Sequence, residues 1–351
     1  IISENDNSYF SISGTTITVK SNTPANTSGY KITVRATDTN SKVTKDATIT
    51  IIVNKKSVTK PTSPANKVYN AEEQNHGISV PEGTSIVTNG STLKATNVGT
   101  YDVIFTLNSN YKWSDGTTSN VTIQWKITAY NLSNATIGSI SDQTYTGSEI
   151  KPTPLVTASM SNVGVATLVN NTDYTYSYSN NINAGTTSNP YATVNVTGKG
   201  NYTGTKSKTF KIIKATNPTV ITANDLTYNA AEQTLVTSSK EQGYICYSLS
   251  AVPTSCSANS ALAKGTNAGT YTVYYLISGN SNYNSKSGSV KVSIKQYDIS
   301  KTATIGIIND QVYTGNAIKP TPNVTVPIPT GKTTTLVNNT DFTYSYSNNK
   351  N

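Results

Sequence analysis

Apolar and polar residues alternate with a period of two along many short stretches of the chain. Period-two alternation predicts β-strands with one buried and one wet face, and such strands separated by turns every 8–12 residues or so predict a β-sandwich. The clearest examples are Tyr101, Val103, Phe105 and Leu107; Val121, Ile123, Trp125 and Ile127; Tyr271, Val273, Tyr275 and Ile277; and Val290, Val292 and Ile294.

Two kinds of turn recur between these strands. An Asn-x-Gly-Thr turn precedes the alternating strand at Gly99, Gly185 and Gly269, and we expect a positive φ there because glycine after asparagine suits such a turn. A small polar turn then ends in an Asn-Tyr pair before a closing strand, at Asn110-Tyr111, Asn201-Tyr202 and Asn282-Tyr283.

The chain repeats itself without gaps at an offset of 168 residues, so that Thr136–Asn181 recurs as Thr304–Asn349. A second, related type lies between these copies, and the turn glycines at 99, 185 and 269 place one unit at about 84 residues. We therefore predict an all-β tandem array of immunoglobulin-like β-sandwich modules. The predicted modules are 1–54 (partial), 55–128, 129–214, 215–296 and 297–351 (partial).

Both ends of the chain fall inside modules on this alignment. Asn351 aligns with Asn183, just before a glycine turn and the last two strands of a module, whereas 28–34 and 47–51 have the pattern of two closing strands. We expect a segment of a longer chain, with any signal, anchor or sorting sequence outside it. The alternative is strand donation between subunits, and a concentration-independent monomer would exclude it.

Composition agrees with short strands joined by polar turns. Charged residues make up 13% of the chain, and there are 4 Phe, 1 Met and 2 Trp but 23 Tyr. The abundant Ser, Thr and Asn disfavour helices, because they compete for backbone hydrogen bonds. The net charge of +9 is spread over many loops without a dense basic run, so we expect no nucleic-acid partner. No apolar stretch approaches the length of a membrane span, and we expect no membrane insertion.

The run Tyr145–Ile212 resembles the immunoglobulin-like repeats of bacterial surface proteins, especially those of Gram-positive organisms. Its motifs are Tyr-x-Gly, Ile-Lys-Pro, an Asn-Thr-Asp-Tyr-Thr-Tyr-Ser-Tyr stretch, Gly-Asn-Tyr-Thr-Gly and Lys-Thr-Phe-Lys-Ile. The resemblance covers about 55–351, while 1–54 is more similar to the last part of a cadherin-like domain. The motifs are specific for the module type and say little about a ligand.

This resemblance implies an exported stalk or adhesin, attached at the cell surface or cell wall. The expected function is an extracellular structural stalk or fibre segment that spaces or presents a distal binding domain. Its expected partners are neighbouring copies or other surface-protein domains. The alternatives are a carbohydrate-binding or host-protein-binding adhesive module, and an immunoglobulin-like decoration of a phage virion.

No catalytic, metal or cofactor site is expected. His76 is a lone histidine in a polar stretch, and the adjacent Glu72 and Glu73 point to opposite faces of a strand, so they cannot act as a pair. Cadherin-like modules bind calcium through several carboxylates. The loose candidates Glu4, Asp6 and Asp38 lack the spacing of such ligands, and we expect neither enzyme activity nor a calcium site.

Three further features concern stability. Cys246 and Cys256 flank a turn of a predicted hairpin, and an exported context favours a disulfide between them over two free thiols. The stripe Tyr174, Tyr176, Tyr178 recurs as Phe342, Tyr344, Tyr346. Because Phe342 lacks the hydroxyl of Tyr174, the hydroxyl is dispensable there, which favours packing in the core over stacking on sugars. A Lys–Asn isopeptide cross-link, known in some Gram-positive modules, is not expected because no suitable acid lies in the core pattern.

Overall fold

The computed structural model describes residues 7–161, 163–258, 260–328 and 331–350. Within these residues it consists of strands, two short 3-10 helices and turns, so the prediction of an all-β chain is confirmed. Among the described residues no helix is long and apolar enough to cross a membrane. The fold is an array of small sheets that pack in pairs, the arrangement of immunoglobulin-like sandwiches.

Contacts divide the chain into two compact units. Unit 1 comprises Ile1–Ile140, Pro152–Ser179 and Thr193–Lys208, and unit 2 comprises Ser141–Lys151, Asn180–Ala192 and Thr209–Asn351. The expected module 129–214 therefore contributes residues to both units.

Unit 1 contains most of the strands in the first part of the chain. They are β1 (Phe10–Ser13), β2 (Thr16–Val19), β3 (Asn26–Thr37), β4 (Thr44–Val53), β5 (Lys56–Val58), β6 (Lys67–Val68), β7 (Gln74–Asn75), β8 (Thr84–Val87), β9 (Lys94–Ala95), β10 (Gly99–Leu107), β11 (Tyr111–Trp113), β12 (Val121–Thr128), β13 (Tyr130–Asn131), β14 (Thr136–Ile137), β16 (Val156–Met160), β17 (Gly164–Thr167), β18 (Tyr174–Ser179) and β20 (Tyr202–Thr203), with the 3-10 helices η1 (Asn7–Tyr9) and η2 (Leu132–Asn134).

Unit 2 contains β15 (Gln143–Thr144), β22 (Val220–Ala223), β23 (Leu226–Thr227), β24 (Gln233–Thr234), β25 (Val236–Ser239), β26 (Ile245–Ser248), β27 (Lys264–Gly265), β28 (Gly269–Ile277), β29 (Lys286–Lys295), β30 (Thr304–Ile305), β31 (Val324–Pro327) and β32 (Thr333–Thr335). Two more strands, β19 (Tyr191–Gly198) and β21 (Thr205–Ile213), have residues in both units.

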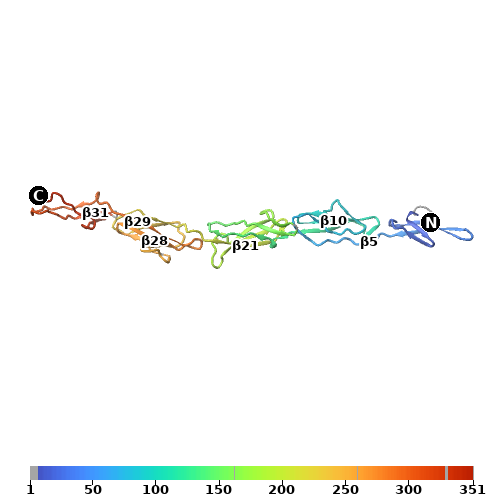
Figure 1. The fold of residues 1–351 in the computed structure, drawn as a ribbon. Coiled ribbons are helices and arrows are strands. Elements are labelled where there is room, and N and C mark those ends of the chain that lie inside the picture. The colour runs from blue at the N-terminus through green and yellow to red at the C-terminus, as the bar shows by residue number, and fades with distance from the viewer. Residues whose placement is uncertain (1–6, 162, 259, 329–330, 351) are drawn as a thin grey trace. The chain divides into compact units, whose positions relative to one another are not determined.

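The same four-stranded sheet occurs three times, with orders β6-β12-β10-β8, β15-β21-β19-β18 and β23-β29-β28-β26. In the first and third sheets a long antiparallel pair forms the centre. In all three a two-residue strand joins one edge in parallel. The pair β28 and β29 is visible as a hairpin in Figure 1.

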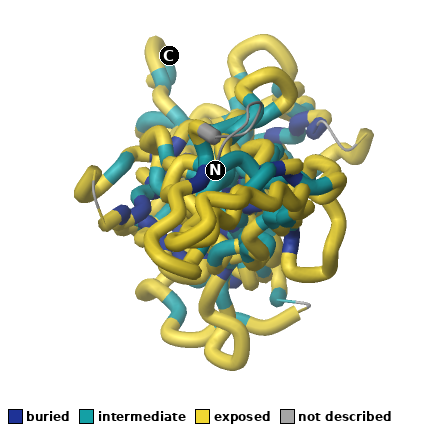
Figure 2. Tube along the Cα trace, turned by 90° about the vertical axis from the view of Figure 1, so that its right-hand side faces the viewer, coloured by how far each residue is buried: buried dark blue, intermediate teal, exposed yellow. Residues whose placement is uncertain are grey.

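The alternating residues of these strands face the cores, as predicted. In β10, Val103 and Phe105 are fully buried, and in β12 Trp125 and Ile127 are 1% and 0% exposed. The corresponding residues of unit 2 are Val273, Ile277, Val292 and Ile294, all buried. Figure 2 shows that the projecting loops are exposed, in yellow, whereas buried residues form short stretches. Burial of these side chains is the main stabilising term of each small sandwich.

Candidate functional site

The Asn-Tyr turns occupy a position that the sequence analysis did not anticipate. In unit 1, Oδ1 of Asn201 accepts a hydrogen bond from the Val98 backbone N–H at 2.8 Å, and its Nδ2 donates to Oδ1 of Asn97 at 2.9 Å. The Asn201 carbonyl oxygen also accepts from the Tyr130 N–H at 3.0 Å. Asn201 is therefore hydrogen-bonded both to the turn before β10 and to Tyr130 at the start of β13.

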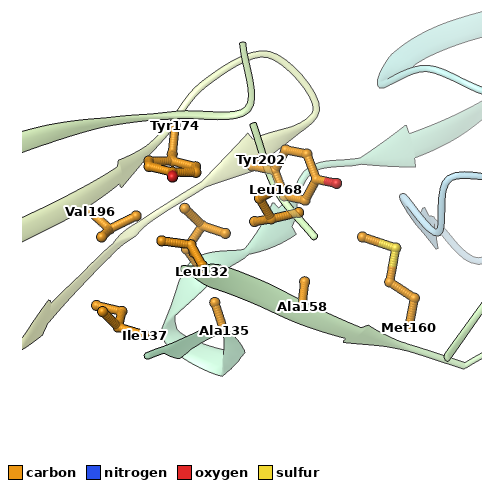
Figure 3. Packing of buried hydrophobic residues seen from close by; sticks show 10 residues of the cluster. Leu132, Ala135, Ile137, Ala158, Met160, Leu168, Tyr174, Val196 and Tyr202 are labelled. Carbon is orange, nitrogen blue, oxygen red and sulfur yellow. The ribbon is translucent and has the colours of Figure 1, made fainter. Parts of the chain in front are cut away.

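The neighbouring Tyr202 fills the core beside this asparagine. Its side chain is 6% exposed and packs in a cluster with Leu132, Leu168 and Tyr174 (Figure 3). Its ring meets Tyr69 edge to face, with centroids 5.4 Å apart, although Tyr69 precedes it by more than a hundred residues. Burial, and to a smaller degree the neighbouring Tyr69, raises the pKa of Tyr202 above its usual range.

The backbone completes this arrangement. β13 and β20 pair in parallel, with Tyr130 opposite Tyr202 and Asn131 opposite Thr203. At the end of β20, Gly204 has a φ of +77°, and a Cβ there would collide with the side chain of Asn131. At this junction the residues of Asn201-Tyr202-Thr203-Gly204 therefore each have a separate contact.

The same contacts recur in unit 2. Oδ1 of Asn282 accepts from the Ala184 N–H at 2.9 Å, and its Nδ2 donates to Oδ1 of Asn183 at 3.1 Å. The Asn282 carbonyl oxygen accepts from the Ala215 N–H at 2.9 Å. Tyr283 meets Tyr145 edge to face at 5.3 Å. Two junctions with different neighbouring sequences therefore have one geometry.

A third Asn-Tyr pair makes part of this arrangement. Oδ1 of Asn110 accepts from the Ala25 N–H at 2.9 Å, and its carbonyl oxygen accepts from the Lys56 N–H at 2.9 Å. Here the Tyr111 ring centroid lies 5.9 Å from the Lys56 ammonium, and the Tyr111 hydroxyl donates to Glu82. We name these three contact sets, centred on Asn110, Asn201 and Asn282, the Asn-Tyr junctions.

The junctions at Asn201 and Asn282, which have the complete set of contacts, are held by hydrogen bonds between neutral groups. Amide-to-amide and amide-to-backbone hydrogen bonds each contribute about 1 kcal/mol, and a buried N–H left without an acceptor costs about 1–3 kcal/mol. No charged side chain takes part in the contacts of Asn201 or Asn282 given above. Their strength is consequently insensitive to ionic strength and to pH near neutrality.

The repeated tyrosine stripe holds a proline-rich segment in place. The hydroxyl of Tyr176 donates to the Pro154 carbonyl, and that of Tyr178 donates to the Pro152 carbonyl at 2.9 Å. The copies repeat both bonds, from Tyr344 to Pro322 and from Tyr346 to Pro320. Tyr174 is 4% exposed and packs in the core, whereas Tyr176 and Tyr178 are half-buried and bond to the prolines of the Ile-Lys-Pro-Thr-Pro motif.

The two cysteines are joined in the structure. Cys246 in β26 and Cys256 in the following loop form a disulfide with Cα atoms 5.4 Å apart. Cys246 is 7% exposed and lies opposite Leu276 of β28 in the antiparallel pair of these strands. The cross-link therefore ties a loop to the edge strand of the third four-stranded sheet.

The explanation given for the turn glycines needs correction at two positions. Gly269 has a positive φ of +149°, but Gly99 and Gly185 do not. A Cβ on Gly185 would instead meet the Pro190 carbonyl oxygen, and one on Gly99 would lie 2.9 Å from the Tyr101 ring. Close approach of neighbouring atoms, rather than a left-handed backbone, is what requires glycine there.

The other polar candidates stabilise their own loops. Nδ1 of His76 accepts from the Ile78 N–H at 2.9 Å, and Glu73 forms an exposed ion pair with Lys94. The Asp38 carboxylate accepts from Asn40 and Ser41, which lowers its pKa. Glu72 is exposed at a turn, with its N–H bonded to Asn70. Glu4 and Asp6 lie outside the described residues.

The part of the chain that the structure describes holds no group of three or more metal-ligating side chains. The junction asparagines are thus the polar side chains with the most consistent role. A sequence signal existed for two of them, since Asn201-Tyr202 and Asn282-Tyr283 follow the Asn-x-Gly turns at Asn97 and Asn183 that they contact. Periodicity alone did not reveal which turn each asparagine reaches.

Comparison with known proteins gives only remote likenesses. No protein-family model matches the chain, and no curated protein matches it. Among solved structures, protocadherin gammaB7 EC3-6 is 13% identical over 72% of this chain and 74% of that one, with a TM-score of 0.23. Surface layer protein SbsC, domains 1-6, is 15% identical over 89% and 49%, with a TM-score of 0.22.

The human desmocollin-1 ectodomain is 11% identical over 68% of this chain and 64% of its own, with a TM-score of 0.16. The chain thus spans about half the length of the surface-layer structure that it resembles. Each TM-score lies below 0.5, so the description of the fold rests on the strands and sheets of this chain itself.

Proposed function

We propose that the chain is a non-catalytic, extracellular spacer, a stalk or fibre segment built from consecutive modules with boundaries near 54, 128, 214 and 296. The observation that supports this most is the recurrence of the Asn-Tyr junction. Asn201 and Asn282 make matching contacts to a preceding turn and to the next strand, within 0.2 Å at each hydrogen bond. A segment that holds other domains at a fixed distance needs a fixed geometry at each connection between its modules.

The physical argument is that direct contacts replace a flexible linker. A free linker of several residues samples many conformations, whereas here the Asn201 carbonyl accepts from Tyr130, two residues after β12 ends at Thr128. The side-chain amide of the same asparagine bonds back to Asn97 and Val98. Bending at this point requires those bonds and the Tyr69–Tyr202 ring contact to break together.

Distance measurements between spin labels test this function. Labels placed on exposed residues Thr118 and Thr167, both in unit 1, report across the Asn201 junction. We expect a narrow distance distribution in the parent chain and a clearly broader one after Asn201→Ala combined with Tyr202→Ala. Asn120→Ala changes an exposed asparagine outside the junction and serves as the matched control.

A broad distribution in the parent chain would contradict the spacer function, because the junction would then impose no geometry. Binding of this chain to components of a glycan array would instead favour the adhesive module. For the partners of a spacer we propose neighbouring modules or copies, at a cell surface.

A further inference from the structure

Each four-stranded sheet joins its first and its last strand in a parallel pair. The two-residue strand that comes first in sequence lies beside the strand that comes last, and the two run in the same direction: β6 with β12, β15 with β21, and β23 with β29. By contrast, the long pairs β10–β12 and β28–β29 are antiparallel. The chain therefore enters and leaves each of these sheets along neighbouring strands of equal direction.

One hydrogen bond extends the parallel pair in the same way each time. The residue just after the short strand is a tyrosine, and its backbone N–H donates to the last carbonyl of the closing strand. The three bonds are Tyr69 to Thr128 at 2.8 Å, Tyr145 to Ile213 at 2.9 Å and Tyr228 to Lys295 at 2.8 Å. At the first of them the Thr128 hydroxyl also donates to the Lys67 carbonyl at 3.0 Å. We name each parallel pair, together with its tyrosine bond, a terminal clamp.

The entering chain is held a second time, ahead of the terminal clamp. In unit 1, β5 lies parallel to β11, with Lys56 opposite Tyr111. In unit 2 a parallel bridge joins Ala215 to Tyr283, and the Ala215 carbonyl accepts from the Asn284 N–H at 3.0 Å. A pull on the chain ahead of β6 or β23 is therefore taken up by two sets of parallel bonds.

Parallel pairing decides how such a pull is distributed. When the chain is stretched, the first strand is drawn toward its amino end and the last strand toward its carboxyl end. Because the strands are parallel, they are drawn along each other in opposite senses, so the evenly spaced bonds between them are loaded together. An antiparallel pair that is pulled at its open end loses its bonds one after another instead.

We propose that the terminal clamps give this chain a further function, which is to carry tensile load. Each clamp has to lose several hydrogen bonds at once before its sheet can open, and forced unfolding is governed by the rate of that step. The inference goes beyond the proposed spacer function and does not rest on it, since a spacer can keep a distance without resisting a stretching force.

The test compares two pulling directions on the first clamp in single-molecule force measurements on the full chain. Handles are attached through introduced cysteines, because Cys246 and Cys256 are joined to each other. Asn54→Cys with Ala129→Cys stretches β6 against β12. Lys94→Cys with Ala129→Cys pulls β10 and β12 apart from their shared open end, where Gly99 lies opposite Ile127.

We expect unfolding at a given force to be at least about tenfold slower in the first direction, because several bonds have to break together rather than singly. The protein is the same apart from one handle position, so a difference in overall stability does not explain such a result. Equal rates in the two directions, or faster unfolding in the first, overturn the proposal.

A pair of variants locates the resistance at the clamp. Thr128→Val removes the hydroxyl that bonds to Lys67, and is expected to speed unfolding in the first direction about two- to tenfold, the loss of one hydrogen bond. Thr122→Val is the matched control, since Thr122 lies exposed in the same strand, opposite Ile104 and away from β6. Equal rates for the two variants contradict the clamp, and the comparison of directions needs neither of them to fold.

The outcomes separate this inference from the spacer function. A narrow distribution of spin-label distances together with equal unfolding rates in the two directions overturns the clamp and leaves the spacer standing. A broad distribution together with slower unfolding in the first direction supports the clamp and contradicts the spacer.

Discussion

The side-chain amide of Asn201 donates to Oδ1 of Asn97 at 2.9 Å, although 104 residues separate the two in sequence. The Asn282–Asn183 pair repeats this contact at 3.1 Å across 99 residues. A hydrogen bond between two asparagines involves no charged group. Its strength therefore depends little on salt concentration or on pH near neutrality.

Removing the junction asparagine is expected to destabilise its surroundings. Asn201→Ala leaves the part-buried Val98 N–H without its acceptor, which predicts a loss of about 1–3 kcal/mol in the free energy of unfolding of unit 1. Urea denaturation measures the loss, and faster hydrogen exchange at Val98 locates it. Asn120→Ala should change neither quantity; a similar loss in that control would show that the effect is not specific to the junction.

The ring of Tyr202 should matter more than its hydroxyl. Tyr202→Ala empties a site that is 6% exposed within the core cluster, and predicts a loss of about 3–5 kcal/mol, as for other large buried aromatic residues. Tyr202→Phe keeps the edge-to-face contact with Tyr69 and should cost about 1 kcal/mol or less. Thermal and urea denaturation compare the variants, and equal losses would contradict a packing role.

The free energy of unfolding should decrease at alkaline pH. Burial raises the pKa of Tyr202 and of Tyr176 in the folded chain, so above the ordinary tyrosine pKa of about 10 the unfolded chain loses protons that the folded chain retains. The free energy of unfolding then decreases as pH rises. Urea denaturation from neutral to alkaline pH should show this decrease, and Tyr202→Phe should reduce its slope. An unchanged slope would contradict the assignment to Tyr202.

The disulfide should stabilise the stretch around β26. A cross-link that closes a loop with a sequence separation of 10 contributes about 2–3 kcal/mol by restricting the unfolded chain. We expect the Cys246→Ser, Cys256→Ser double variant to unfold at lower urea concentration by that amount. Intact mass of the unreduced chain checks the bond directly: two hydrogens should be missing, with no loss of ammonia. A mass equal to that of the reduced chain would refute it.

The turn glycines should differ in their tolerance of alanine. Gly185→Ala places a Cβ against the Pro190 backbone, which cannot move aside, and should cost about 1–3 kcal/mol. Gly99→Ala meets the Tyr101 side chain rather than backbone, and should cost less because a side chain can adjust more easily than backbone. Urea denaturation ranks the two, and the opposite order would contradict close approach as the reason for glycine at these sites.

Several levels of the fold were predictable from the sequence. The alternation in β10 and β28 identified strands and their buried faces, because side chains of a strand point to opposite sides in turn. The repeat of Thr136–Asn181 as Thr304–Asn349 reappears as matching backbone hydrogen bonds. The function of the Asn-Tyr turns was not predictable in this way, since the pattern identifies a turn without naming its partner.

By itself the sequence determined the all-β class, the strand faces and the repeat, because these depend on local preference and on the period of burial along the chain. Only the tertiary structure decided that Asn201 reaches Asn97 and that Gly185 faces Pro190. These relationships join residues far apart in sequence or depend on which strand lies alongside. Packing, and not local preference, sets them.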